Sequence, residues 1–169
     1  MNALAGDGGL DVSLRELART VGVTPAAVYR HFPNKGALLA ALAGEGLEML
    51  GEEQLAACRE AGSGMAGFVA TGRAYVRFAL THPALFRLMF AHGEPVLPSH
   101  KSDPASRLLH DLTAELTGGE GPAAERLALR AWSLAHGIAL LMLDRRLPAD
   151  AALIDQLIDA DALRAGADL

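Results

Sequence analysis

The sequence predicts an all-α fold, and three observations support this prediction. Of the 169 residues, 51% are hydrophobic and only 5% are aromatic, and much of the hydrophobic share is alanine and leucine, which favour helices. Apolar residues recur at spacings of three and four, as they do on one face of a helix. No segment alternates apolar and polar positions with β-branched side chains, as half-buried strands do. We expect a small N-terminal part, residues 1–45, and a larger C-terminal part, residues 46–169.

The first helix expected in the N-terminal part begins at Ser13. The segment Ser13-Leu14-Arg15-Glu16 has the S-x-x-E pattern of a capping box, in which the serine and the glutamate each accept a hydrogen bond from a backbone amide. The helix is expected to end at Gly22, because glycine tolerates the left-handed conformation found just beyond helix ends.

A second short helix is expected directly after this turn. Thr24 is a good N-cap, and Pro25 takes the first helical position, where its missing amide costs nothing; the helix then covers residues 26–31. Two short helices joined by a turn with glycine have the dimensions of a helix-turn-helix, whose second helix enters the DNA major groove. On dimensions alone, the pair could equally belong to any helical bundle.

A long helix is expected next, from Lys35 to the Gly62-Ser63-Gly64 break, with three glycines weakening its middle. Another apolar helix is expected to end near His82-Pro83, and a short one covers residues 85–90. Both are strongly apolar, so we expect them in the core.

The remaining chain is expected to hold a loop and three helices. Residues 91–104 are rich in proline, glycine and serine and are predicted to form the loop. Helices are expected over residues 105–116, from Pro122 to about Arg145, and, as a single last helix, from about Asp150.

Composition excludes several classes of protein. The net charge of −5 argues against indiscriminate binding of polyanions, because non-specific affinity for DNA comes from lysine and arginine. Any DNA contact is therefore local. The single cysteine, Cys58, cannot form an internal disulfide, which fits a reducing cytoplasm. The N-terminus does not resemble a secretion signal. The apolar stretch 127–143 is shorter than a bilayer requires, so we interpret it as a buried helix.

The residues of the two short helices resemble the signature of the TetR family of transcriptional regulators. In this signature, a Gly-Val turn precedes a helix that ends in Tyr-x-His-Phe, followed by a lysine; here the matching run is Gly22-Val23-Thr24-Pro25-Ala26-Ala27-Val28-Tyr29-Arg30-His31-Phe32-Pro33-Asn34-Lys35. The resemblance implies a homodimer that binds palindromic operator DNA through an N-terminal helix-turn-helix head. It also implies a C-terminal helical domain for ligand binding and dimerisation.

The resemblance also implies which residues contact DNA. Arg30 is the best candidate for a base contact, since its guanidinium can pair with guanine O6 and N7. Lys35 would bind a phosphate beside the start of the long helix, where backbone amides help. The full set expected at the DNA is Ser13, Arg15, Thr24, Pro25, Ala26, Ala27, Tyr29, Arg30, His31 and Lys35.

One feature departs from the family pattern. A helix of about four turns precedes the capping box in this family, and only residues 3–9 resemble its final turn here. Without cover from that helix, the apolar side chains of Leu14, Leu17 and Val28 would be more exposed, so we expect a head of low stability. We expect a longer form to bind DNA better.

The C-terminal part is expected to form the dimer. The stretch 127–143 is apolar almost all round, and a helix of this kind in a soluble protein must be covered on several sides. One chain of this size can scarcely provide that cover. The resemblance implies a four-helix interface built from the last two helices of each protomer, which places two heads on two half-sites.

The C-terminal part is also expected to hold a ligand. It resembles a subgroup of the family with a Trp-His-Gly motif, matched here at Trp132, His136 and Gly137. Trp132 and His136 are one helical turn apart and share a face; core packing, with His136 bonded to backbone, is an equally open interpretation. The expected lining of a pocket for a small apolar effector is Phe68, Tyr75, Phe78, Phe86, Met89, Phe90, Trp132 and His136. Such an effector would release the DNA by shifting the population of conformations.

Other functions are less well supported by the sequence. No catalytic motif, cofactor motif or metal-ligand spacing occurs, so we expect neither an enzyme nor a resident cofactor or metal. Metal sensing by His82, His92 and His100 is a weaker variant. The main alternative is a dimeric helical adaptor or small-molecule-binding protein without DNA function.

Overall fold

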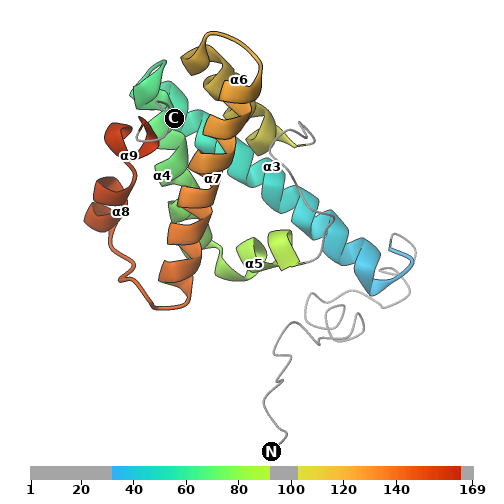
Figure 1. Cartoon of the computed structure of the whole chain (residues 1–169). Coiled ribbons are helices and arrows are strands. Elements are labelled where there is room, and N and C mark those ends of the chain that lie inside the picture. Colours follow the sequence, from blue (N-terminus) through green and yellow to red (C-terminus); the bar gives the residue numbers. More distant parts are fainter. Residues whose placement is uncertain (1–31, 92–102, 165–169) are drawn as a thin grey trace, which may run out of the picture. The chain divides into compact units, whose positions relative to one another are not determined.

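The computed structural model describes residues 32–91 and 103–164, and every regular element within them is an α-helix. This confirms the all-α prediction. The chain divides into two compact units, residues 1–41 and 42–169, and the division falls four residues before the expected boundary. Figure 1 shows the helices, whose bounds are α3 Lys35–Ala61, α4 Met65–Thr81, α5 Pro83–Ala91, α6 Pro104–Thr117, α7 Pro122–Leu143, α8 Ala151–Leu157 and α9 Ala160–Arg164.

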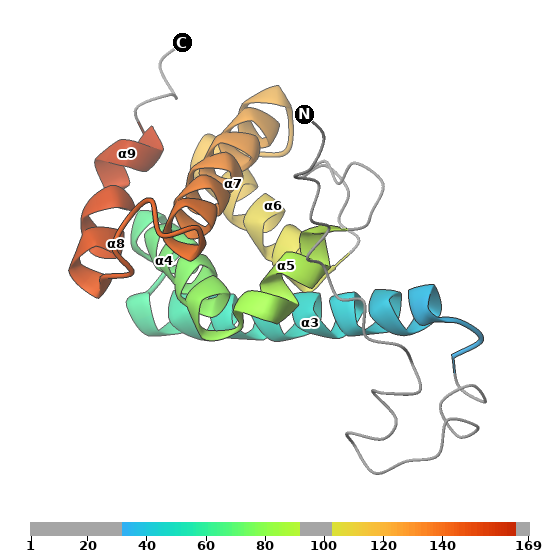
Figure 2. The same ribbon diagram turned by 90° about the horizontal axis from the view of Figure 1, so that it is seen from below.

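Helix α4 is the centre of the C-terminal unit. It packs against α5, α6, α7, α8 and α9, and Figure 2 shows it lying among them. Its apolar side chains supply much of the core: Phe68, Val76 and Phe78 are at most 1% exposed. Phe86 of α5 is fully buried beside them. The two apolar helices expected on either side of His82-Pro83 therefore lie in the core, as predicted.

Prolines and capping residues set most of the helix ends. Pro83, Pro104 and Pro122 each open a helix, because a proline at the first position gives up no hydrogen bond. Asp103 caps α6 by accepting a hydrogen bond from the Ser106 amide at 2.9 Å. At its other end, Gly118 takes the left-handed conformation, with φ of 81°.

The glycines of α3 do not interrupt it, although they were expected to weaken it. Two of them lie where neighbouring helices approach. A Cβ atom on Gly46 would come within 2.7 Å of the Met89 sulfur. On Gly51 it would lie 2.6 Å from Cβ of Pro104. The start of α6 therefore requires glycine at position 51, whereas a side chain at position 46 would force the flexible side chain of Met89 in α5 to shift.

The single helix expected after Asp150 is two helices, α8 and α9, and the prediction was wrong on this point. The first helix ends at Leu157, with Ile158 as its C-cap, and the carboxylate of Asp159 then accepts a hydrogen bond from the Ala162 amide at 2.7 Å. This new cap starts a second helix. Arg73 of α4 holds the break in place by donating hydrogen bonds to the backbone oxygens of Ile158 and Asp155, both at 2.9 Å.

Helix α7 has two different faces. The alanines at positions 128, 131, 135 and 139 are buried. On the opposite side, Leu129 and Leu141 are 44% and 45% exposed. Among the described residues, α7 is the one helix that has the length and composition of a membrane span, a test that core helices of soluble proteins also pass. The single chain covers only one side of this apolar helix.

Candidate ligand-binding cavity

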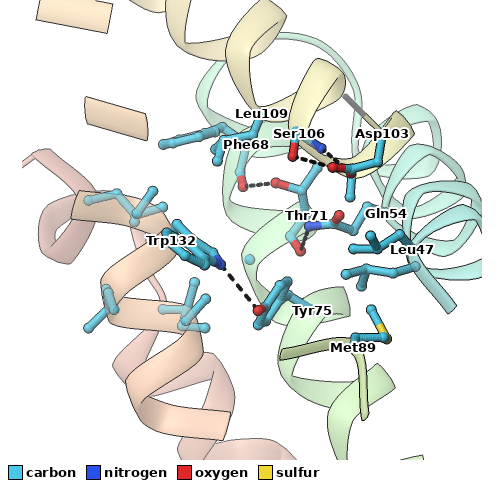
Figure 3. A pocket seen from close by; sticks show the side chains of 18 of the residues that line it. Leu47, Gln54, Phe68, Thr71, Tyr75, Met89, Asp103, Ser106, Leu109 and Trp132 are labelled. Carbon is cyan, nitrogen blue, oxygen red and sulfur yellow. Dashed lines mark hydrogen bonds between the residues drawn. The ribbon is translucent and has the colours of Figure 1, made fainter. Parts of the chain in front are cut away.

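A cavity of about 130 Å³ lies within the C-terminal unit. It is close in size to an engineered protein cavity of about 150 Å³ that binds benzene. Figure 3 shows most of the side chains around it. Helices α3, α4, α6 and α7 contribute most of the wall, α5 adds Met89 and Phe90, and the C-terminal segment adds Ile158 and Leu163.

Five of the eight residues expected at a pocket line this cavity. They are Phe68, Tyr75, Met89, Phe90 and Trp132. Phe78, Phe86 and His136 do not line it. Phe78 and Phe86 are at most 1% exposed in the core, and the ring of Phe86 packs edge-on against Tyr75 with centroids 5.5 Å apart. Phe86 therefore supports the wall from behind through Tyr75.

Trp132 and Tyr75 of the aromatic wall form a hydrogen-bond chain with His136, which lies outside the wall. The indole Nε1 of Trp132 donates to the Tyr75 hydroxyl at 3.2 Å, and this hydroxyl lies 2.8 Å from Nδ1 of His136. An indole can only donate, so the arrangement that pairs all three groups has the hydroxyl donating to an unprotonated Nδ1. The partner of His136 is thus a hydroxyl 61 residues away in sequence, and not the backbone group that was considered.

Burial keeps Tyr75 and His136, the two titratable groups of this hydrogen-bond chain, uncharged. It raises the pKa of the Tyr75 phenol above its ordinary value; the hydrogen bond from Trp132 lowers this pKa and the charge of Asp103 adds to the rise. Burial also lowers the pKa of His136, so the imidazole is neutral near pH 7 and can accept a hydrogen bond. This wall of the cavity is therefore apolar and internally paired.

The other side of the cavity is polar, and sequence reasoning missed it. Gln54, Thr71, Asp103 and Ser106 line it, and Figure 3 shows them across from Trp132. The Asp103-Pro104 pair at the start of a helix was a signal for a cap, though not for a cavity. Nothing in the sequence distinguishes Gln54 from the glutamates that precede it.

The residues expected at the DNA lie largely outside the described part of the chain. This holds for Ser13, Arg15, Thr24, Pro25, Ala26, Ala27, Tyr29, Arg30 and His31. Lys35 is described and opens α3, where the side chain of Asn34 accepts a hydrogen bond from the Ala37 amide at 2.8 Å.

The histidines considered for metal sensing are not brought together within the described residues. His92 and His100 lie outside them. His82 packs against Phe78, with ring centroids 4.9 Å apart, and lies 3.9 Å from a carboxylate oxygen of Glu53. No group of three or more potential metal ligands gathers in residues 32–91 and 103–164.

Two family models match the chain. Residues 68–161 match a model described as "Tetracyclin repressor-like, C-terminal domain", and residues 2–42 match one described as "Bacterial regulatory proteins, tetR family". The first match alone spans more than half of the chain. The narrower Trp-His-Gly subgroup stays a prediction.

Two solved structures are similar along nearly the whole chain. A protein with unknown function from Rhodococcus sp. RHA1 is 35% identical, with 96% of this chain and 84% of that chain covered and a TM-score of 0.69. The crystal structure of SCO4313, a protein described as regulatory, is 22% identical and covers 97% of this chain and 88% of its own, with a TM-score of 0.65. The second likeness concerns the fold alone. No curated protein matches.

Proposed function

We propose a specific role for this chain, which belongs to the TetR family of transcriptional regulators: it is a repressor that responds to a ligand. As a homodimer it binds palindromic operator DNA and releases it when a small apolar effector enters the cavity. In this proposal residues 1–45 form the DNA-binding domain and residues 46–169 the domain for ligand binding and dimerisation. We also propose that it works in the cytoplasm and is not an enzyme.

The observation that carries the proposal is the continuity of α3. This helix begins at Lys35 and supplies Leu47, Leu50 and Gln54 to the cavity wall. Leu47 lies twelve positions after Lys35 on this helix, which is about 18 Å along the axis. An effector that presses on the cavity end of α3 can therefore act on the helix that follows the predicted DNA-binding motif. Its differential affinity for two positions of α3 would shift the population between DNA-binding and released states.

Base recognition and phosphate contacts are assigned to different residues. We propose that Arg30 reads a guanine in the major groove, while Ala26 and Ala27 pack against thymine methyl groups. Tyr29, His31 and Lys35 are proposed to bind phosphates, with Ser13, Arg15, Thr24 and Pro25 also at the DNA surface. Few of the residues assigned to the groove have long polar side chains, so this proposal includes a specificity based on few contacts.

The dimer is proposed to use the outer face of α7 together with the last helices. Leu129, Ser133, Gly137 and Leu141 follow each other at spacings of four along α7. A Cβ atom built on Gly137 meets nothing within 4 Å, which leaves room for a partner helix. A twofold dimer on this face would give two heads at the spacing of one helical turn or a multiple of it.

The experiment is selection of operator sites from random duplexes by the dimer, followed by fluorescence anisotropy on the selected site. We expect a palindromic site and an affinity that falls steeply with salt. Arg30→Ala should relax the preference at one base pair, and Lys35→Ala should weaken binding to all duplexes alike. Failure to enrich any site, or salt-independent binding, would favour the alternative of a helical adaptor or small-molecule-binding protein without DNA function.

A further inference from the structure

A row of side chains at every fourth position of α7 is left uncovered by the single chain. Five of its six members are exposed, and the sixth, Gly137, is half-buried with nothing within 4 Å of a Cβ atom built on it. Rows of this spacing are the ridges that interdigitate in the commonest class of helix packing. The row consists of Glu125, Leu129, Ser133, Gly137, Leu141 and, directly after the C-cap of the helix, Arg145.

Positions at equal distances from Ala135 along this row match in size or in charge. The matching pairs are Ser133 with Gly137, Leu129 with Leu141, and Glu125 with Arg145. In a twofold interface, residue i contacts residue j of the partner and j contacts i. A twofold axis at the level of Ala135 therefore places a small residue against a small one, leucine against leucine, and a carboxylate against a guanidinium. The row is complementary to a second copy of itself that runs in the opposite direction.

The charges at the two ends of the row distinguish this arrangement from a parallel one. In a parallel pair each position meets itself, so Glu125 would meet glutamate and Arg145 would meet arginine, and like charges across an interface oppose association. In an antiparallel pair each meets the opposite charge. Within residues 32–91 and 103–164, neither side chain forms an ion pair of its own. Both are therefore available to a partner subunit.

The adjacent positions give a second pair of opposite charges. Arg126 and Asp144 are each nine positions from Ala135, and both are exposed. Asp144 accepts a hydrogen bond from Arg87 of its own chain, and a carboxylate has about four acceptor positions. The partner's Arg126 can therefore join this ion pair without displacing Arg87.

We propose that two copies of this chain pair through this row, with their α7 helices antiparallel about a twofold axis at the level of Ala135. This inference rests on the dimer of the proposed function and adds its orientation and its residue pairs. Leu129 packs on the partner's Leu141, Ser133 faces the partner's Gly137, and Glu125 pairs with the partner's Arg145.

This pairing places the partner beside the effector cavity. Ala131, Trp132, Leu134 and Ala135 line the cavity, and Ser133, between them in sequence, faces the partner. An effector and the partner subunit therefore contact the same turn of α7.

Cysteine cross-linking of the full chain tests the orientation, in a Cys58→Ala background because Cys58 is the one native cysteine. Leu129→Cys and Leu141→Cys in one chain should give a covalent dimer on oxidation, and so should a mixture of the two single variants. Neither single variant should cross-link alone. Two copies of one position lie about 18 Å apart along antiparallel helices, and a disulfide requires Cα atoms within about 7 Å. Leu55→Cys, at an exposed leucine of α3, is the matched control and should not cross-link to Leu141→Cys.

Charge reversal tests the residue pairs. Glu125→Arg should raise the dimer dissociation constant about tenfold, because two ion pairs per dimer become two repulsions. Arg145→Glu should do the same, and the two substitutions together should return the constant to within about threefold of the native value. Glu60→Arg makes the same change of charge at an exposed position of α3 and should leave the constant unchanged. Analytical ultracentrifugation measures all four.

The outcomes distinguish this inference from the proposed function beneath it. Cross-linking of either single cysteine variant alone would mean a parallel pair and would overturn the inference, and so would a charge-swapped chain that does not recover; the dimer on α7 would stand in both cases. A native dimer that no cysteine pair cross-links would overturn the inference and move the interface away from this row. A chain that stays monomeric at every concentration and on the selected operator would overturn the homodimer itself.

Discussion

The two faces of α7 show the difference between a surface that one chain completes and a surface that it leaves open. The inner face is a row of alanines on the side of α7 that packs against the other helices, among them α4 and α6, and Ala128 and Ala139 are fully buried. The outer face carries two exposed leucines, and Leu129, next to Ala128 in sequence, is 44% exposed. Small residues permit close helix contact inside the chain. The two exposed leucines, Leu129 and Leu141, lie outside it on one face of the helix, and exposed apolar side chains grouped in this way are typical of a surface that meets a partner.

Enlarging the inner face should give the largest effect on folding. Ala128→Leu adds three carbon atoms at a fully buried position of α7, and overpacking of this kind costs about 1–3 kcal/mol. Urea unfolding followed by circular dichroism measures the loss. Leu129→Ala is the matched control at the adjacent position. An equal loss in both variants at protein concentrations where the chain is monomeric would contradict the distinction between the faces.

Polar substitution of the outer face should break the dimer and leave the fold intact. In Leu129→Gln combined with Leu141→Gln, we expect the dimer dissociation constant to rise at least about tenfold, since two apolar side chains lose their burial. Analytical ultracentrifugation over a concentration series gives this constant. The melting temperature of the monomer should stay the same, because both side chains are exposed within one chain. A dimer of unchanged strength would place the interface elsewhere.

The sequence predicts most of the fold because local chemistry determines the helix ends. Pro83, Pro104 and Pro122 each open a helix, and the stretches between them carry an apolar period. The break between α8 and α9 was missed, because Arg73, which donates a hydrogen bond to the backbone at Ile158, lies 85 positions earlier in the sequence. Contacts of this range have no periodic signal in the sequence.

For the same reason, the sequence predicted the aromatic wall of the candidate site but not its polar side. Large aromatic residues on apolar helices are natural candidates for a cavity wall, and Tyr75 and Trp132 were found in this way. The polar side depends on three helices meeting: Gln54 of α3, Thr71 of α4 and Asp103 before α6. A glutamine in a run of acidic residues resembles any solvated helix face, so only the fold places it on the cavity wall.

The smallest expected effect concerns His136, which extends from α7 to Tyr75 of α4. Burial lowers the pKa of the His136 side chain in the folded state, whereas in the unfolded state this side chain has its ordinary pKa of about 6.5. Below about pH 6.5 the unfolded state therefore binds the proton more readily, and the free energy of unfolding should fall as the pH drops through this value towards the folded pKa. It should level off once the pH lies below the folded pKa.

Because the chain has six histidines, the measurement is a difference between two proteins. His136→Asn keeps an acceptor for the Tyr75 hydroxyl and removes the titrating ring. The stability of the native chain minus that of the variant, measured by urea unfolding, should decrease from about pH 7.5 to about pH 5.5. A difference that stays constant over this range would mean that the ring is protonated as easily in the folded chain as in water, and that the pairing of Trp132, Tyr75 and His136 does not hold it neutral.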